Sequence, residues 1–210
     1  MAGPEKGLSI PEGDSVREYS PEEEGALSLN LKDLLSGINQ GLYAQRPLDA
    51  RLLFDFHATL FGEVRDHAGR CRRRGFGQEH VTFGPNRSIK REDVPAELDK
   101  LFQRARTRLR QLGEYRQAQG VDVEYVMAAI ECAVQTHADV VRIHPFEDGN
   151  GRTSRALMNH ILLMLGLDPI PMEAPKQEYN DCLNAYFAGQ RSIRPIVDLY
   201  IGLYAVGLRR

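Results

Sequence analysis

Twelve consecutive residues, 144–155, combine side chains that could transfer a proton, bind a metal ion and bind an anion: His-Pro-Phe-Glu-Asp-Gly-Asn-Gly-Arg-Thr-Ser-Arg. His144 can accept a proton near neutral pH, so it could activate a hydroxyl nucleophile. Asp148 offers a hard oxygen ligand, and Mg²⁺ commonly takes one or two carboxylates together with phosphate oxygens. The segment therefore predicts a site that binds a polyphosphate and moves part of it.

The glycine-rich centre of this segment is predicted to open a helix. Helix N-termini carry unpaired N–H groups and a partial positive charge, so they bind phosphate. Gly149 and Gly151 flank Asn150, and glycine lets the backbone approach an anion closely. Arg152 and Arg155 are three residues apart, which places them on neighbouring parts of one helix face. Guanidinium groups suit phosphate oxygens, so these residues are candidate anion ligands.

Each part of the segment also has an ordinary structural explanation. A Gly-Asn-Gly sequence is often only a turn, a single histidine can be packed in a core, and two arginines can lie on a solvated face. Taken singly, each part favours that explanation, whereas their combination in one frame favours a functional site. Phe146 is predicted to anchor the loop in the core rather than to touch a substrate.

The elements that must position this segment are helical. Apolar residues recur at spacings of three and four, which predicts helices at about residues 48–63, 94–112, 121–143, 152–165, 176–188 and 194–208. The helix at 152–165 is apolar on nearly all sides, so we expect it to be the central buried helix.

A further helix is predicted to begin at Ser20. Ser20 is a suitable N-cap, Pro21 suits the first turn, and Glu23 completes a capping box. Residues 78–87 break the helical pattern with β-branched and aromatic residues beside a Gly-Pro-Asn turn, which predicts a short hairpin. The sequence therefore predicts an all-α fold with one small β-hairpin.

Length and composition bound the function. The chain has 210 residues and a net charge of −2, so we expect one domain and no direct contact with nucleic acid. Residues 1–19 are predicted to be a mobile tail, residues 20–44 a helical extension, and residues 45–210 the main domain. The basic run at 70–74 is typical of a solvated loop or helix end, and the alternative is that it contacts phosphate or an acidic partner.

The cysteines and the chain's hydropathy indicate a compartment. Cys71, Cys132 and Cys182 are odd in number and widely spaced, which predicts neither a disulfide framework nor a zinc site and fits a reducing environment. There is no signal sequence at the N-terminus and no apolar run of the length that a membrane helix needs. We expect a cytoplasmic protein without membrane contact, and secretion by a route without a signal sequence stays open.

Residues 144–155 resemble the signature of the Fic family, His-x-Phe-x-[Asp/Glu]-Gly-Asn-Gly-Arg-x-x-Arg, at every fixed position. His137 lies seven residues before His144, as is common in that family. Phe56-His57-x-x-Leu60 and Ala68-Gly-Arg-x-Arg72 are similar to the segments that precede the family's flap hairpin, and the predicted hairpin falls where that flap belongs. The resemblance covers about residues 45–208.

The resemblance implies an α-helical protein adenylyltransferase, which transfers AMP from ATP to a Ser, Thr or Tyr hydroxyl of a target protein and releases pyrophosphate. It implies that His144 is the base that deprotonates the target and that Asp148 holds a Mg²⁺ bridging the α- and β-phosphates. It also implies an anion hole, formed by Gly149, Asn150, Gly151 and Arg152. It implies that Arg155 contacts the γ-phosphate. Related kinases carry a different sequence after the acid, so the intact motif favours nucleotidyl transfer.

The resemblance also implies where the other parts of the substrates bind. Val81, Thr82 and Phe83 would clamp the target peptide by strand addition. Adenine would lie near the following helix, around Asn180 and Phe187, where many family members have tyrosine and asparagine instead.

Many proteins of the family are restrained by a helix bearing [Ser/Thr]-x-x-x-Glu-[Gly/Asn], whose glutamate pairs with the second motif arginine. Ser20 and Glu24, followed by Gly25, fit that pattern, so we expect Glu24 to pair with Arg155 and exclude the γ-phosphate. Pro21 and the neighbouring acids depart from the usual helix. A capped, acidic helix start explains the same residues.

Three alternatives to AMP transfer stay open. The same site could remove AMP with Glu24 orienting a water, or transfer another phosphate-linked group. The protein could also be a nucleotide-binding regulator or the partner of a toxin-like protein, although a pure binder has no need of a base. A metal site made of His137, His144 and Asp148 matches no zinc spacing. The target protein, a possible homo-oligomer, and inhibition within one chain or across a dimer are left open by the sequence.

Overall fold

The computed structural model describes residues 18–72, 80–170, 176–190 and 192–207. Its helices and strands are α1 (Pro21–Asn39), α2 (Ala50–Phe61), β1 (Thr82–Phe83), β2 (Asn86–Arg87), the 3₁₀ helix η1 (Arg91–Asp93), α3 (Val94–Gln119), α4 (Val123–Ile143), α5 (Asn150–Met164), α6 (Lys176–Phe187) and α7 (Arg194–Gly207). The prediction of an all-α fold with one small hairpin is confirmed.

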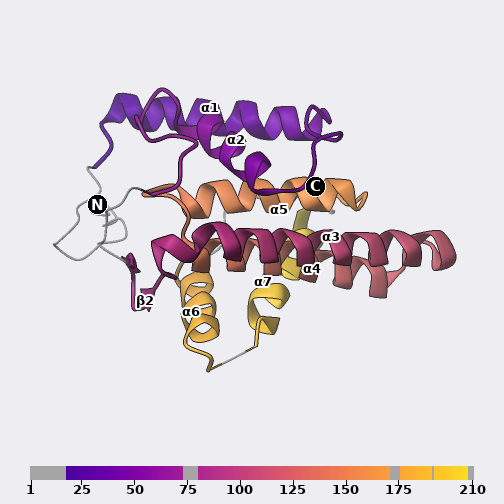
Figure 1. Ribbon diagram of the computed structural model, residues 1–210. Coiled ribbons are helices and arrows are strands. Elements are labelled where there is room, and N and C mark those ends of the chain that lie inside the picture. The colour runs from indigo at the N-terminus through magenta and orange to yellow at the C-terminus, as the bar shows by residue number, and fades with distance from the viewer. Residues whose placement is uncertain (1–17, 73–79, 171–175, 191, 208–210) are drawn as a thin grey trace, which may run out of the picture.

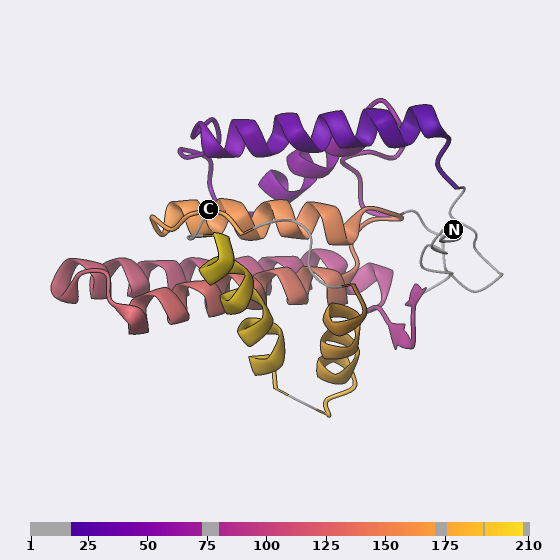
Figure 2. The same cartoon turned by 180° about the vertical axis from the view of Figure 1, so that it is seen from behind.

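Helix α5 lies between two groups of helices (Figure 1). Helices α1 and α2 pack together on one side of α5, and α4 packs against it from the other side. Helices α3 and α7 each pack against α4 in turn. The reverse view shows the same layers, with α6 and α7 paired below them (Figure 2). Ten of the 15 residues of α5 are buried, so the prediction that this is the central helix is confirmed.

Side-chain caps set where the helices begin. The capping box predicted at α1 is present: Glu23 N–H donates to Ser20 Oγ (3.2 Å), and the Ser20 N–H donates to the Glu23 carboxylate (2.8 Å). Asp49 caps α2 through the N–H of Leu52 (3.0 Å) in the same way. Each cap satisfies an N–H group that has no partner within its own helix.

Helix α3 is about two turns longer than the sequence predicted. It continues to Gln119 rather than ending near residue 112. Leu112 is buried, and the ring of Tyr115 stacks on Tyr125 of α4 with centroids 6.3 Å apart. Packing against α4 therefore carries the helix through Gly113, and it ends only at Gly120, where φ is 85°.

The hairpin is shorter than predicted within the described residues. Thr82 pairs with Arg87 and Phe83 with Asn86, around a turn in which Gly84 has φ of 55°. Val81 precedes β1, and its carbonyl accepts from the Ser88 N–H (2.9 Å). Parts of four other predictions lie outside the described residues: the tail at 1–17, the hairpin start at 78–79, part of the basic run at 73–74, and residue 208 of the last helix.

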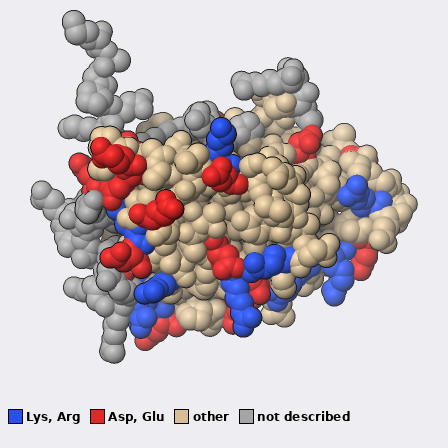
Figure 3. All heavy atoms as spheres, turned by 90° about the horizontal axis from the view of Figure 1, so that it is seen from above, with Lys and Arg blue, Asp and Glu red and all other residues tan. Residues whose placement is uncertain are grey.

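In the described part of the chain, no helix is both long and apolar enough to cross a membrane. Figure 3 looks down on the α1 side of the molecule and shows acidic and basic side chains interspersed over an otherwise uncharged surface.

Candidate functional site

Residues 144–151 form the turn that joins α4 to α5. His144 ends α4 in the left-handed conformation, with φ of 55° and ψ of 59°, and Gly149 precedes α5 with φ of 76°. The turn lies at the end of the molecule where α1 begins and where the hairpin and α6 meet (Figures 1 and 2). Three segments distant in sequence therefore surround it.

His144 presents a free nitrogen for proton transfer. Its Nδ1–H donates to the Val141 carbonyl (3.3 Å), which leaves the lone pair on Nε2. Burial lowers the pKa of His144 to about 4, against the raising effect of the Val141 hydrogen bond. The buried Arg72 donates from Nε to the His144 carbonyl (2.9 Å). The imidazole is therefore neutral and held in place near pH 7.

The hairpin and α6 cover this histidine. The Phe83 ring stacks on the His144 ring with centroids 4.5 Å apart and planes 15° apart. Phe83 also meets Phe187 of α6 edge-on at 5.9 Å, and Asn86 donates to Asn184 of α6 (2.6 Å). The structure therefore brings the predicted flap residue Phe83, the predicted base and the predicted adenine residue Phe187 together.

The amide of Asn150 holds the turn closed. Its Oδ1 accepts from the Phe146 N–H and its Nδ2 donates to the Phe146 carbonyl, both at 3.0 Å. Phe146 itself is fully buried, as predicted. The Asn150 side chain is thus engaged in the turn, and we assign anion binding at this position to the backbone N–H rather than to the amide.

His57 of α2 also holds the turn, a role that sequence reasoning missed. Its ring is stacked between Phe61 (4.6 Å) and Phe146 (3.8 Å). Its Nδ1 accepts from the Gly69 N–H (2.8 Å), so its Nε2–H donates to the Asp148 carbonyl (3.0 Å). The only signal in the sequence was the family-like Phe56-His57 pair, which says nothing about the partner.

Gly149 is required by both its conformation and its surroundings. A Cβ at this position would lie 2.2 Å from ring atoms of Phe61, and φ is in the left-handed region. The absence of a side chain lets Phe61 pack beneath the turn.

Asp148 and Arg152 meet at the start of α5, and Tyr19 meets both. One oxygen of Asp148 accepts from the Gly149 N–H (2.5 Å) and the other from the Tyr19 hydroxyl. Arg152 Nη2 donates to the Tyr19 oxygen (3.3 Å). Tyr19 was not singled out from the sequence, because the contact spans 129 residues and the residue lies in the predicted tail.

This donor set fits a Mg²⁺ that arrives with a nucleotide. No group of three or more His, Cys, Asp or Glu side chains that could hold a metal occurs in the part of the chain that the structure describes. Asp148 alone would supply one carboxylate oxygen beside a helix N-terminus and an arginine, and phosphate oxygens and water would complete the shell.

Arg155 lies one turn further along α5. Its Nε is buried without a hydrogen-bond partner among the described residues. Its Nη1 lies 3.4 Å from the position that a Cβ of Gly151 would take, so the guanidinium folds back toward the start of the helix. The guanidinium lies beside the hydroxyl of Tyr179, where its charge opposes the rise that burial causes in the pKa of Tyr179.

The predicted pairing of Glu24 with Arg155 is not present in the structure. Glu24 is exposed in the first turn of α1, and none of the ion pairs of the described residues involves it. The preceding residue, Glu23, turns inward instead and pairs with Arg65 (3.0 Å). Successive residues of a helix differ by about 100° in direction, so a motif that fits by spacing can still present its acid to solvent.

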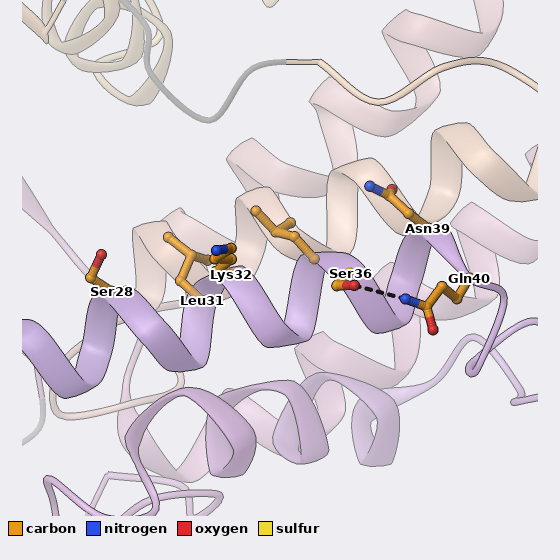
Figure 4. Close-up of a pocket in the computed structure, with 7 residues that line it drawn as sticks. Ser28, Leu31, Lys32, Ser36, Asn39 and Gln40 are labelled. Atoms are coloured by element: carbon orange, nitrogen blue, oxygen red, sulfur yellow. Dashed lines mark hydrogen bonds between the residues drawn. The ribbon is translucent and has the colours of Figure 1, made fainter.

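The remaining predicted residues are partly placed. Thr82 is exposed on β1 and Val81 is partly buried beside it. Asn180 is partly buried on α6, one residue beyond Tyr179. Away from the motif, Figure 4 shows a shallow hollow along α1, where Leu31 and Lys32 lie beside a hydrogen bond from Gln40 to Ser36 (2.9 Å). No motif residue lines that hollow.

The model of the Fic/DOC family matches residues 47–162, which is more than half of the chain and contains the whole motif. The chain belongs to the Fic/DOC family. Its Fic domain places the motif at the junction of α4 and α5, as described above.

Curated relatives named protein adenylyltransferase Fic match a shorter stretch. The protein from Culex quinquefasciatus is 40% identical over 74 residues, or 35% of this chain and 14% of that protein. The protein from Nematostella vectensis is 41% identical over 73 residues, or 34% of this chain and 17% of that protein. The matches thus span a small part of the relatives' length.

Solved Fic structures share the fold. Fic-1 from C. elegans (residues 134–508) superposes with a TM-score of 0.64 at 22% identity, over 97% of this chain and 53% of that chain. The N-terminal Fic domain of a cell filamentation protein from Bartonella quintana, solved with bound ADP, gives 0.63 at 18% identity, over 94% and 92%.

We predict that acidification destabilises the fold through its buried histidines. Burial lowers the pKa of His57, His144 and His160 to about 4 and that of His137 to about 3. The unfolded chain takes up these protons near pH 6.5, whereas the folded chain does not. The unfolded state therefore binds more protons, and the free energy of unfolding should fall by several kcal/mol between about pH 7 and about pH 5.

Urea unfolding at a series of pH values measures this fall. His160→Leu removes one of the four groups, and its Nε2 has no hydrogen-bond partner among the described residues, so this variant should show a shallower pH dependence. A free energy of unfolding that is constant or rises on acidification would contradict the prediction.

We predict that Gly149→Ala destabilises the turn. The left-handed φ and the contact with Phe61 should together cost about 2–5 kcal/mol of unfolding free energy. Gly113→Ala is the matched control, because a Cβ there meets nothing within 4 Å inside α3 and should stabilise by about 0.5–1 kcal/mol. Denaturant unfolding of both variants measures the difference, and equal effects would refute the assigned strain.

Proposed function

We propose that the protein is an adenylyltransferase that transfers AMP from ATP to a Ser, Thr or Tyr hydroxyl of a protein. One observation carries the proposal: a neutral histidine with a free Nε2 ends α4, and six residues later α5 begins with N–H groups that could bind an anion. Base and phosphate site are thus separated by a single, tightly held turn. The ADP bound to the Bartonella quintana domain and the AMPPNP bound to BepC of Bartonella tribocorum agree with a nucleotide in a site of this fold.

The proposed reaction is a displacement at the α-phosphorus. The hydroxyl oxygen bonds to that phosphorus, the bond to the bridging oxygen of the β-phosphate breaks, and pyrophosphate leaves. His144 Nε2 takes the hydroxyl proton. The N–H groups of Asn150 and Gly151 and the Arg152 guanidinium would stabilise the charge on the transferred phosphate, and Arg155 would hold the γ-phosphate. The Gly149 N–H already donates to Asp148, so Gly149 would contribute its conformation and its lack of a side chain.

Asp148 would hold Mg²⁺ in this scheme. When bound, the ion would neutralise phosphate charge and favour departure of pyrophosphate. The hairpin would align the target peptide along Thr82 and Phe83, and Phe83 would have to leave its stack on His144 for a hydroxyl to reach Nε2. Adenine would lie against Asn180 and Phe187 of α6.

The test incubates the protein with Mg²⁺ and ATP labelled on the α- or γ-phosphate and follows label into protein. We expect α-label in the wild type and none in His144→Ala, because the base is gone while the fold and the phosphate site stay. Glu24→Gly tests the restraint that the motif at Ser20 and Glu24 predicts from the sequence. Because Glu24 faces solvent, we expect its labelling to equal that of the wild type. Entry of γ-label would indicate a kinase, and ATP binding without any label would indicate a regulator.

A further inference from the structure

A buried chain of hydrogen bonds connects the two ends of the phosphate site. Ser154 Oγ donates to the Gly151 carbonyl (3.2 Å), so it accepts from His137 Nδ1–H (2.9 Å). His137 Nε2 is then an acceptor and receives the Tyr179 hydroxyl hydrogen (2.7 Å). The Tyr179 oxygen, having given its hydrogen away, presents a lone pair beside the Arg155 guanidinium, whose charge opposes the rise that burial causes in the pKa of Tyr179. Each group donates to the next, in one direction, from Tyr179 to Gly151.

The chain is sealed from solvent. His137 and Ser154 are 0% exposed and Tyr179 is 9% exposed. Burial, together with the nearby Arg155 charge, lowers the pKa of His137 to about 3, so the ring is neutral and has one donor and one acceptor, as the chain requires. Buried polar networks of this kind fix a single arrangement, because each unmade bond costs the desolvation of its group.

We propose that Tyr179, supported by His137, is a positioning residue that holds the Arg155 guanidinium where the γ-phosphate would bind. The inference rests on the proposed function, because it concerns nucleotide binding at that site. An arginine loses side-chain entropy when it is held. A hydroxyl that orients Arg155 before ATP binds removes this entropic cost from the free energy of ATP binding. The affinity for ADP should not change in the same way, because ADP has no γ-phosphate to contact Arg155.

Tyr200 supplies the matched control. Its ring packs on both His137 (5.9 Å) and Tyr179 (6.3 Å), but its buried hydroxyl has no hydrogen-bond partner among the described residues. Tyr179→Phe and Tyr200→Phe each remove one buried hydroxyl from the same cluster of rings, and only the first breaks the chain.

The experiment measures the Kd of Mg-ATP and Mg-ADP by calorimetry for the wild type and both variants. We expect Tyr179→Phe to raise the Kd of ATP about tenfold with little change for ADP, and Tyr200→Phe to leave the ratio of the two constants unchanged. An unchanged ratio in Tyr179→Phe, or an equal change in Tyr200→Phe, would overturn the inference. A wild type that binds neither nucleotide would overturn the proposed function and this inference with it.

A separate set of contacts concerns Tyr19, which lies just before α1. Its hydroxyl donates to Asp148 and accepts from Arg152, and its ring lies under the guanidinium groups of Arg65 (4.2 Å) and Arg152 (5.1 Å). The Glu23–Arg65 ion pair fastens the start of α1 beside it, with side-chain exposures of 18% and 9%. A tyrosine thus engages both the carboxylate assigned to Mg²⁺ and the arginine assigned to the α-phosphate.

We infer that Tyr19 competes with Mg-nucleotide for Asp148 and Arg152, so that the segment before α1 must move for the site to load. The apparent affinity of a site is reduced by the fraction of molecules in which it is open. Tyr19 lies five residues before the motif acid Glu24, and Glu24 faces solvent. Restraint of nucleotide binding is therefore assigned to Tyr19 and not to Glu24.

Calorimetric titration with Mg-ATP tests this in Tyr19→Ala and in Tyr19→Phe, which keeps the ring if the smaller side chain fails to fold. We expect Tyr19→Ala to lower the Kd about tenfold and Tyr19→Phe to lower it less. The exposed neighbour Glu18→Ala should leave it unchanged. An unchanged or higher Kd in both Tyr19 variants, or a larger gain from Glu24→Gly than from Tyr19→Ala, would overturn the inference.

Discussion

The pairing of backbone groups in one buried turn is the constraint on which the site depends. Residues 144–150 reverse the chain between two core helices, so their N–H and C=O groups leave water and must find partners in the protein. Arg72 donates to the His144 carbonyl, and His57 donates to the Asp148 carbonyl. The Asn150 side chain bonds both the N–H and the carbonyl of Phe146. The same bonds that satisfy the turn therefore fix the position of His144 at one end and the start of α5 at the other.

The proposed reaction has a second requirement: the substrates must be able to reach His144 and the start of α5. Phe83 covers the His144 ring and Tyr19 engages Asp148 and Arg152, so the proposed base and the proposed metal and phosphate ligands are all covered in this conformation. Side-chain hydrogen bonds hold the turn, whereas its two covers come from a two-stranded hairpin and from Tyr19, just before α1. Loading and release would then involve these covers and not the phosphate site.

The sequence predicted what is local and missed what is long-range. Helical periodicity and capping residues depend on neighbours within a few positions, so seven helices and the α1 capping box could be predicted. The motif could be predicted because its chemistry lies in twelve consecutive residues. His57 and Tyr19 act across 91 and 129 residues, and α3 extends past Gly113 because α4 packs on it. Glu24 fits a pattern of spacing, but spacing does not decide which of two adjacent glutamates faces inward.

The most direct test of the central claim is a crystal structure of the protein with a non-hydrolysable ATP analogue and Mn²⁺. The account predicts an anomalous Mn²⁺ signal beside Asp148, phosphates at the first N–H groups of α5 with the terminal phosphate on Arg155, and Tyr19 displaced from Asp148. Nucleotide bound elsewhere, or bound at the start of α5 with Tyr19 still on Asp148 and Arg152, would contradict it.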